Sequence, residues 1–430
     1  MPTTLVAGNN QQPETLERKL ELGLVFLLLL GFWDANLPSP LDKAITVLAY
    51  GILPLLIIRR WKPCLYVATR DIFLLLLVGV ALISIFWSVA PENTIKVSRG
   101  LLRSTFLGLY LAVRYTPKEQ MRLLLWVFGI TALLSLVVAL AIPSYGIAMT
   151  NNELSWKGIL LHKQYLGRMM AIGAVFFLLN ALNNHKFRWI MWAGCSLAVA
   201  LVFLSRSKTS LALSLLALLL LPFLKILKQN YKLAVALLMI LLLLCGGLAV
   251  LVFSNLETII VDMLGKDMTL NNRVPLWTLC LEKALERPWL GYGYAGFWPS
   301  EAGFYVFTYS WASDQKEFTD YSQFHSHNGF LEIFLQLGFL GLSLLILSLL
   351  SVFQRVVKSM LLTKTLESFC IFEYIILMLL FNYTENQTFV SAGTMWSLYV
   401  SVALSTTVWG NRIGKSESQT QLLAEKQGLG

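Results

Sequence analysis

The stretch "FHSHNGFLEIFLQLGFLGLSLLILSLLSVF", residues 324–353, contains the feature that decides the fold, since a polar segment ends here and a long apolar run begins. A helix needs about 20 apolar residues to cross the hydrocarbon core of a bilayer. The run over residues 328–353 exceeds that length, and its one charged residue is Glu332. The stretch therefore predicts a transmembrane helix that starts beside two histidines, at a membrane surface.

The composition of the whole chain agrees with this stretch. Of its 430 residues, 57% are hydrophobic and 13% are charged, whereas an ordinary soluble domain carries about 25% charged residues. So few polar groups cannot cover a surface that faces water, which excludes an ordinary soluble protein. The five cysteines are scattered without the spacing of metal ligands, so we interpret them as small core residues.

Similar apolar runs recur along the chain, and we interpret twelve of them as membrane spans. An even number of spans places both termini on one side of the membrane. Lys and Arg favour cytoplasmic loops, and with both termini in the cytoplasm every predicted cytoplasmic segment holds at least two of these residues. Topology then explains the net charge of +10, and no nucleic-acid partner is expected. The spans are predicted at residues 20–33, 43–58, 70–90, 99–115, 119–142, 165–182, 188–204, 209–224, 232–254, 328–353, 367–383 and 392–409.

The predicted fold class is an all-α polytopic membrane protein of about twelve transmembrane helices, with one large extracytoplasmic loop that contains short helices. Within this loop, "RVPLWTLCLEKALERP", residues 273–288, has the pattern of an amphipathic helix. At another boundary, "TPKE", residues 116–119, has the pattern of a capping box with proline at the first helical position. The predicted parts are helices one to nine in residues 1–254, the loop in 255–327, helices ten to twelve in 328–410 and a cytoplasmic tail in 411–430.

Basic residues on the predicted outer side need a separate explanation. In "SRSKTS", residues 205–210, Arg206 and Lys208 lie in a tight turn between two apolar runs, without an acidic residue. Burial of Arg at membrane depth costs about 2.5–3.5 kcal/mol on insertion scales, which points to an anionic partner for Arg206. The alternative is that these side chains snorkel to the membrane surface, and for Lys208 the two explanations are equally good.

Arg273 is a second candidate for binding an anion. It follows two asparagines, either of which would cap a helix that begins near Val274. A helix N-terminus carries free N–H groups and about half a positive charge, and the planar fork of Arg matches phosphate oxygens. This combination suits a diphosphate, and a solvated loop arginine is the alternative.

Three further cations near the outer ends of spans are candidates for the same diphosphate site: Arg103, Lys163 and Arg168. Arg103 and Arg168 lie inside apolar runs, where a structural ion pair with another span is the alternative. The glycine-rich "GYGYAGF", residues 291–297, formally matches GxGxxG, but no strand or βαβ unit surrounds it. We therefore interpret this run as a turn with aromatic contacts rather than a dinucleotide site.

His325 and His327 are two of only four histidines in the chain. The first alternative is that the two histidines bind a metal ion. However, imidazoles at i and i+2 do not share a helical face, and no nearby Cys or carboxylate completes a zinc set. A structural role is a second alternative. We favour chemistry, because an unperturbed imidazole titrates near pH 6.5, which suits a general base at neutral pH. Glu332 and Gln336 continue one face of the following helix, where they would orient the imidazole or bind hydroxyls.

Here the sequence resembles a known family. "HSHNGFLEIFLQLGFLG" resembles the His-Asn-x-x-Leu signature of the O-antigen ligase and polysaccharide polymerase superfamily, the Wzy_C group. Four more stretches resemble the family in the same order, over most of the chain from about residue 80 to 410: "FWSVAP", "LLHKQYLGRMMAIG", "SRSKTSLAL" and "NNRVPLW…ERPWLGYGYAGFW". The set is most similar to the ExoQ-like branch. The chain departs from the pattern at Gln164, where the family often has Asn.

The resemblance implies a GT-C-like glycosyltransferase of the bacterial inner membrane, with its active site facing the periplasm. Such proteins transfer a glycan from an undecaprenyl-diphosphate donor to an acceptor hydroxyl, with inversion and without a catalytic metal or other cofactor. Carried over by motif, Arg206 and Arg273 would bind the diphosphate, and His327 would activate the acceptor. Polymerisation of repeat units is the first hypothesis, and ligation of the glycan onto lipid A-core or another acceptor is the alternative.

Further expectations concern the acceptor, the partners and the rival functions. Expected partners are the lipid-linked oligosaccharide, membrane lipid, and a flippase and a chain-length regulator of the same pathway.

Two rival functions are a transporter and a structural subunit. A transporter would place its charges near the bilayer midplane, whereas the candidate cations are predicted at the outer rim. In a structural subunit the cations would be dispensable. The candidates for binding the acceptor or the sugar are His325, Asn328, Glu332, Tyr294 and Trp298.

Overall fold

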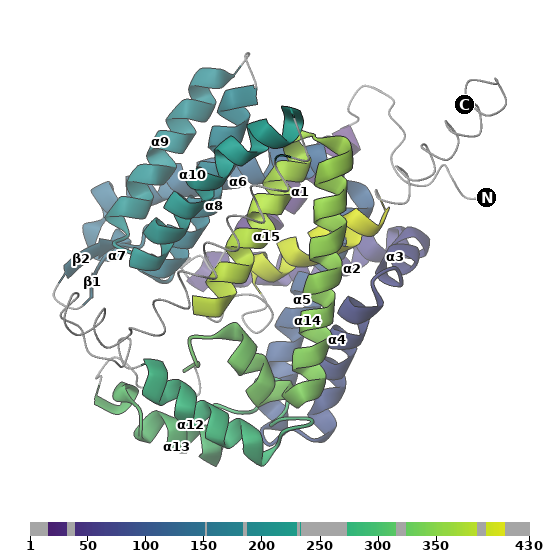
Figure 1. Cartoon of the computed structure of the whole chain (residues 1–430), viewed down its shortest axis with the longest axis vertical. Helices are drawn as coiled ribbons and strands as arrows, with labels where there is room; N and C mark the ends of the chain where they lie inside the picture. Colours follow the sequence, from purple (N-terminus) through teal and green to yellow (C-terminus); the bar gives the residue numbers. More distant parts are fainter. Residues whose placement is uncertain are drawn as a thin grey trace.

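The computed structural model describes residues 16–31, 39–150, 153–183, 187–229, 233, 273–314, 324–384 and 393–408. In these ranges the chain forms a bundle of helices with one small antiparallel hairpin at its side (Figure 1). The helices before residue 230 are α1 (Leu16–Gly31), α2 (Ser39–Arg59), α3 (Trp61–Ala68), α4 (Ile72–Ile83), η1 (Ser84–Phe86), α5 (Pro91–Arg114), α6 (Pro117–Ala141), α7 (Pro143–Gly146), α8 (Lys163–Asn183), α9 (Arg188–Leu204) and α10 (Lys208–Gln229). Those after residue 272 are α12 (Arg273–Glu286), α13 (Glu301–Thr308), η3 (Trp311–Asp314), α14 (Gly329–Thr363), α15 (Leu366–Thr384) and a helical segment over 394–408.

Four of the described helices are long and apolar enough to cross a membrane: α6, α8, α14 and α15. Residues Lys43–Arg59 of α2 pass the same test together with α3, although the two helices meet at an angle of 91°. The prediction of a mostly helical membrane protein is thereby confirmed in its coarse form. The count of twelve spans stays a prediction, and apart from residue 233 the ninth of them, 232–254, lies outside the described residues.

Local signals in the sequence place two helix starts correctly. Thr116 Oγ1 accepts a hydrogen bond from Glu119 N at 3.3 Å, and Glu119 Oε2 accepts one from Thr116 N at 2.9 Å, so the predicted capping box begins α6. The amphipathic pattern in the loop is the helix α12. The hairpin of β1 (Ile147–Thr150) and β2 (Glu153–Trp156) was not expected, because four-residue strands are too short to show a clear alternation of apolar residues.

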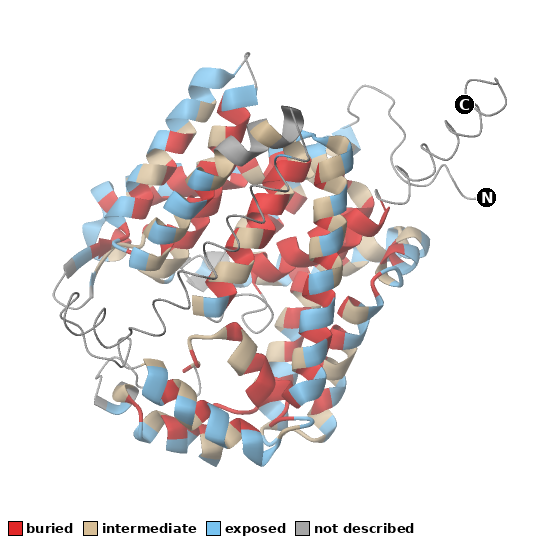
Figure 2. Cartoon of the chain, viewed as in Figure 1, coloured by how far each residue is buried: buried red, intermediate tan, exposed pale blue. Residues whose placement is uncertain are grey.

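The buried residues face the middle of the bundle, while the outside of the helices is exposed (Figure 2). Large apolar side chains are among the exposed ones, including Phe86, Trp189 and Leu219. Such a surface is expected where helices face lipid rather than water. We call the end of the bundle that carries α12, α13 and His327 the loop end. The far end carries the start of α6 and the connection between α14 and α15.

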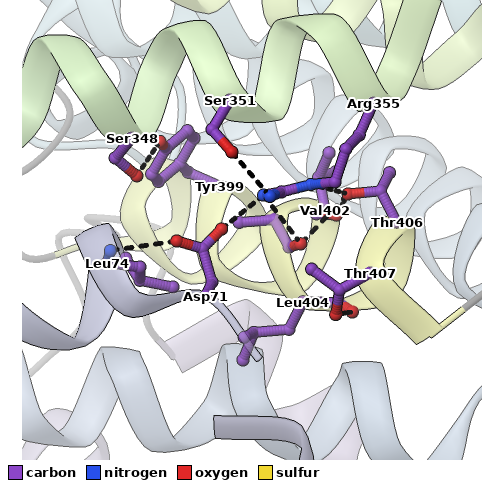
Figure 3. Close-up of polar contacts among 11 residues, drawn as sticks. Asp71, Leu74, Ser348, Ser351, Arg355, Tyr399, Val402, Leu404, Thr406 and Thr407 are labelled. Atoms are coloured by element: carbon purple, nitrogen blue, oxygen red, sulfur yellow. Dashed lines mark hydrogen bonds and ion pairs between the residues drawn. The ribbon is translucent and has the colours of Figure 1, made fainter. Parts of the chain in front are cut away.

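A buried ion pair joins helices at the far end (Figure 3). Asp71 caps α4 by accepting a hydrogen bond from Leu74 N at 3.0 Å, and it accepts another from Arg355 Nη2 of α14. Arg355 Nε also donates to Thr406 Oγ1 at 3.3 Å. The pair therefore connects α4, α14 and the helical segment 394–408.

We predict that Asp71→Ala destabilises the protein far more than Glu17→Ala. Removing one partner of a buried pair costs about 3–5 kcal/mol, an upper limit here because the side chain of Arg355 is 25% exposed. The pair between Arg59 and Glu17 is exposed on both sides, where such pairs contribute about 0–1 kcal/mol. Thermal unfolding of the detergent-solubilised variants measures the difference, and equal melting temperatures would contradict this account of the ion pair.

Candidate functional site

The helix α14 breaks near its start. Gly338 has φ of 60° and ψ of −161°, which is outside the helical region. The amides after the break find acceptors in a distant loop: Phe339 N donates to Pro288 O at 2.7 Å, and Leu340 N donates to Trp289 O at 3.2 Å. A Cβ on Gly338 would lie 2.3 Å from the carbonyl carbon of Trp289, so only glycine fits this approach.

The carbonyl groups before the break are paired with the same loop. Tyr292 N donates to Leu335 O at 3.0 Å, and Gly293 N donates to Gln336 O at 2.8 Å. The side-chain oxygen of Gln336 accepts a further hydrogen bond from Ala295 N at 2.8 Å. The glycine-rich run is therefore a turn, as predicted, and its backbone satisfies main-chain groups that the broken helix leaves open.

The segment from η1 to the first turn of α5 holds this turn from the other side. Thr94 Oγ1 donates to Tyr294 O at 2.7 Å, and Ser84 Oγ accepts from Tyr294 N at 2.9 Å. Three more bonds join the two segments: Trp87 Nε1 to Leu290 O, Val89 N to Tyr292 O and Asn93 Nδ2 to Ala295 O. The "FWSVAP" and "WLGYGYAGFW" motifs, far apart in the sequence, thus form one unit with the break in α14.

Glu332, in the first turns of α14, connects this unit to the histidines. Its side chain is fully buried, and a buried carboxylate needs hydrogen-bond donors to offset its lost hydration. Oε1 accepts from Trp298 Nε1 at 2.6 Å and from Gln336 Nε2 at 2.9 Å, while Oε2 accepts from Ser326 N at 2.9 Å. Ser326 is the residue between the two histidines, so Glu332 fixes the backbone that presents them.

His327 itself lies in a tight, left-handed turn with φ of 53°. Its amide donates to His325 Nδ1 at 3.2 Å, and the two rings lie 4.1 Å apart between centroids. Because His325 Nδ1 accepts this bond, the neutral imidazole of His325 carries its proton on Nε2. Asn328 caps α14 with Oδ1, which accepts from Phe330 N at 3.0 Å and Leu331 N at 3.2 Å. Both imidazoles are partly exposed.

Arg273 and the histidine segment meet at the C-terminal end of α15. Arg273 Nη1 donates to Thr384 O at 2.7 Å, on the last turn, where helix carbonyls carry partial negative charge. Gly329 abuts the same turn, since a Cβ there would lie 2.2 Å from Asn382 Oδ1. On α12, Trp277 Nε1 donates to Ser326 O at 2.9 Å. The structure thus brings together the segments that carry two of the predicted site residues.

The turn that carries Arg206 packs on a different helix. Arg206 is exposed and has φ of 51°, whereas the flanking Ser205 and Ser207 are buried. Both serines lie against Gly167 of α8, where a Cβ would come within 2.9 Å of them. The serines therefore face α8, and Arg206 faces outward. The turn leads directly into α10, which contacts both α8 and α15.

The remaining predicted cations lie on α8 and α5. Lys163 is the first residue of α8 and is partly buried. Arg168 is 3% exposed, and its guanidinium stacks over the Tyr165 ring at 4.8 Å. Arg168 directly follows Gly167 and so lies next to the Arg206 turn along α8. Arg103 stacks over Tyr50 of α2 at 5.2 Å, which ties it to a different pair of helices.

Three of the candidates for binding sugar are buried, namely Glu332, Tyr294 and Trp298. Their hydrogen bonds hold the loop end together, as described above. The aromatic faces of Trp298 contact Phe297 and Phe324 edge to face, at 4.9 Å and 5.1 Å between centroids. In this arrangement the three side chains position the site rather than line an open surface, and their contact with sugar stays a prediction.

Most residues that hold the site in place carry no recognisable signal in the sequence. Trp277 and Ser84 each form one hydrogen bond to a distant segment of the site, to Ser326 and Tyr294, and no spacing in the sequence indicates these bonds. Gly338 had a detectable signal, since it interrupts an apolar helix of strong helix formers. Among the described residues, no group of three or more His, Cys, Asp or Glu side chains is placed to hold a metal ion.

We predict that Gly338→Ala loosens the loop end. The new Cβ would require a strained left-handed residue, at about 1–3 kcal/mol, and would collide with the Trp289 carbonyl. Limited proteolysis between α12 and α13, together with thermal unfolding, measures the effect. Gly79→Ala is the control, because nothing lies within 4 Å of a Cβ there, and a gain of up to about 1 kcal/mol is expected. Equal protection of both variants would show that the break does not depend on this glycine.

Two comparisons with known proteins each found a similar sequence. The O-antigen ligase family (Wzy_C) matches residues 193–346, a range that contains Arg206, Arg273 and His327. The exopolysaccharide production protein ExoQ of Rhizobium meliloti (strain 1021) is 26% identical over 325 residues, which cover 74% of this chain and 72% of that protein. Both matches agree with the resemblance that the motifs indicated: the chain is similar to the O-antigen ligase and ExoQ-like superfamily.

Proposed function

We propose that this protein is a membrane glycosyltransferase that transfers a glycan from an undecaprenyl-diphosphate donor to an acceptor hydroxyl. The family match supports this class of reaction. The relative with 26% identity is named for exopolysaccharide production, which favours polymerisation of lipid-linked units over ligation onto another lipid.

One observation carries the proposal: His327 sits in a left-handed turn whose backbone is held by Glu332 and Trp277. A non-glycine residue with positive φ costs of order 1–3 kcal/mol and persists where its surroundings fix it, often at functional sites. Arg206 is a second such residue. A partly exposed imidazole on a rigid turn, in a segment that meets the end of α15 where Arg273 is bound, suits a base that acts on a hydroxyl.

The cations would bind the leaving group. Arg206 and Arg273 lie on segments that reach α15, and their planar guanidinium groups match the oxygens of a diphosphate. Arg168, Lys163 and Arg103 are further candidates for this role. Positive groups that are fixed before the reaction stabilise the charge that develops on the diphosphate in the transition state.

The proposed reaction is a single displacement. His327 takes the proton of the acceptor hydroxyl while the hydroxyl oxygen bonds to the anomeric carbon, on the face opposite the diphosphate. The bond between that carbon and the diphosphate oxygen breaks, and its electron pair leaves with undecaprenyl diphosphate. The configuration at the anomeric carbon is thereby inverted. His325 and Asn328 are proposed to contact the acceptor.

The orientation in the membrane is part of the proposal. Both termini would lie in the cytoplasm of a bacterium, with a cytoplasmic tail over residues 411–430. The transmembrane helices would lie in residues 1–254 and 328–410 of the inner membrane. The loop that connects them, residues 255–327, would face the periplasm. The donor would arrive from a flippase on that side, and a chain-length regulator would act on the product. No described contact favours the transporter hypothesis.

We predict that His327→Ala, Arg206→Ala and Arg273→Ala each abolish chain lengthening. A positioned base contributes about 10²–10⁴-fold, and one cationic donor contributes about 10²–10³-fold. The assay uses purified protein with a defined undecaprenyl-diphosphate oligosaccharide and separates products by length. Lengthening without a second acceptor indicates a polymerase, and a strict need for another acceptor indicates a ligase.

Arg188→Ala is the matched control, because it removes an exposed arginine at the start of α9, which lies at the far end of the bundle. It should keep full activity. Arg206→Lys and Arg273→Lys keep the charge without the fork, so intermediate rates are expected. Wild-type rates in all three alanine variants would remove the enzymatic proposal.

Transfer should also persist after thorough chelation of divalent ions, because the arginines rather than a metal bind the diphosphate charge. The measurement is the rate of chain lengthening in excess chelator, with and without added Mg²⁺. A strict requirement for the added ion would contradict the proposed chemistry.

A further inference from the structure

A large cavity lies at the far end of the bundle, away from His327. Its volume is about 1150 Å³, above the usual range of about 300–1,000 Å³ for ligand pockets. The first two thirds of α6, the last turns of α8 and the first half of α9 form its walls, and the connection between α14 and α15 forms part of its rim. None of the residues proposed for glycan transfer is among the described lining residues.

The depth of the cavity corresponds to one leaflet of a membrane. Along α6 its lining runs from Lys118 to Leu133, which is a rise of about 22 Å at 1.5 Å per residue. Along α9 it runs from Phe187 to Leu197, a rise of about 15 Å. Half of the hydrocarbon core is about 15 Å, so the cavity extends from the headgroup level to the region of the bilayer midplane.

The deep part of the cavity is apolar. Trp126 is 68% exposed there, and Leu133 and Ile190 are exposed as well. Gly129 of α6 contributes no side chain to this wall, and a Cβ on it would meet only the Phe177 ring, at an ordinary 3.5 Å. This glycine therefore opens space that a larger residue would fill.

The mouth of the cavity is basic. Lys118, Arg122 and Lys364 line it and are exposed, and no carboxylate in the described part of the chain forms an ion pair with them. Lys364 caps α14 in a left-handed conformation with φ of 50°, which fixes its place at the mouth. One acidic residue, Glu367, also lines the cavity. Among the described lining residues, three cations and one carboxylate leave a net charge of +2.

We infer that this cavity binds an anionic phospholipid, with the phosphate among the three cations and an acyl chain along α6 and α9. The charge at the mouth complements the phosphate, and the depth matches a lipid that occupies one leaflet. An undecaprenyl chain is far longer than one leaflet, and a soluble anion would have no use for the apolar wall. The inference needs only membrane lipid and stands independently of glycan transfer.

The test uses the full-length protein in vesicles of phosphatidylcholine that contain a minor fraction of phosphatidylglycerol with a photoactivatable acyl chain. Cross-linked peptides are expected from α6 and α9, within residues 117–141 and 188–204. Unlabelled phosphatidylglycerol should suppress the labelling, whereas phosphatidylcholine should not. Equal labelling by a phosphatidylcholine probe, or displacement by undecaprenyl phosphate where phosphatidylglycerol fails, would overturn the inference.

Two kinds of variant locate the binding. Combined Lys118→Gln, Arg122→Gln and Lys364→Gln should weaken competition by phosphatidylglycerol about 100-fold, because each of the three cations near a headgroup contributes about a factor of five. The charge-matched control replaces three exposed cations outside the lining stretches with Gln and should label as the wild type does: Lys62, Arg70 and Lys96. Unchanged labelling of the first triple variant would refute a role for the basic mouth.

Gly129→Leu fills the cavity without altering its charge and should abolish labelling of α6 and α9. Gly79→Leu is its control, since it adds the same side chain to α4 where nothing lies within 4 Å of a Cβ. Melting temperatures of both variants confirm that they fold. A folded Gly129→Leu variant that labels like the control would show that the lipid binds elsewhere.

Discussion

The loop end depends on the hydrogen bonds that residues 288–296 form across the break in α14. A helix that breaks inside an apolar environment exposes main-chain groups, each of which costs several kcal/mol if left unpaired. Here the loop supplies two carbonyl groups, from Pro288 and Trp289, and two amides, from Tyr292 and Gly293. Because these bonds repair the break, the first turns of α14 can leave the direction of the long helix and carry Asn328 and Glu332 toward the site.

Glu332 extends this arrangement to the candidate catalytic residue. A carboxylate accepts hydrogen bonds at both oxygens, and this one receives them from the loop through Trp298, from its own helix and from the backbone between the histidines. A glutamine in its place would accept at one end and donate at the other. Motifs that lie far apart in the sequence thus share one physical purpose, which is to hold His327 in a turn that is unfavourable by itself.

Much of the helical fold could be predicted from the sequence, whereas fewer of the contacts in the candidate site could, and the reasons are physical. Apolar run length and capping chemistry are local, so α6, with its Thr116 cap, and α12 were found. The cations on the predicted outer side stood out because charge is scarce in this composition, and their role in binding an anion stays a prediction. The roles of Glu332, Tyr294 and Trp298 were harder to infer, since the sequence does not tell whether a polar or aromatic side chain faces a substrate or a distant backbone group. The basic mouth of the far cavity was explained as topology, because only the fold shows that Lys118, Arg122 and Lys364 border one space.

The two ends of the bundle differ in their chemistry in a way that suits a membrane enzyme. The loop end fixes imidazole and guanidinium groups with a dense network of hydrogen bonds, whereas the far end combines largely buried ion pairs between helices with an open apolar cavity. The most direct measurement is a structure of the protein in a lipid nanodisc with undecaprenyl diphosphate bound. Our account predicts that the diphosphate contacts Arg206 and Arg273, with the His327 imidazole on the open side of the same space. A diphosphate bound away from both arginines, or separated from His327 by packed helices, would contradict it.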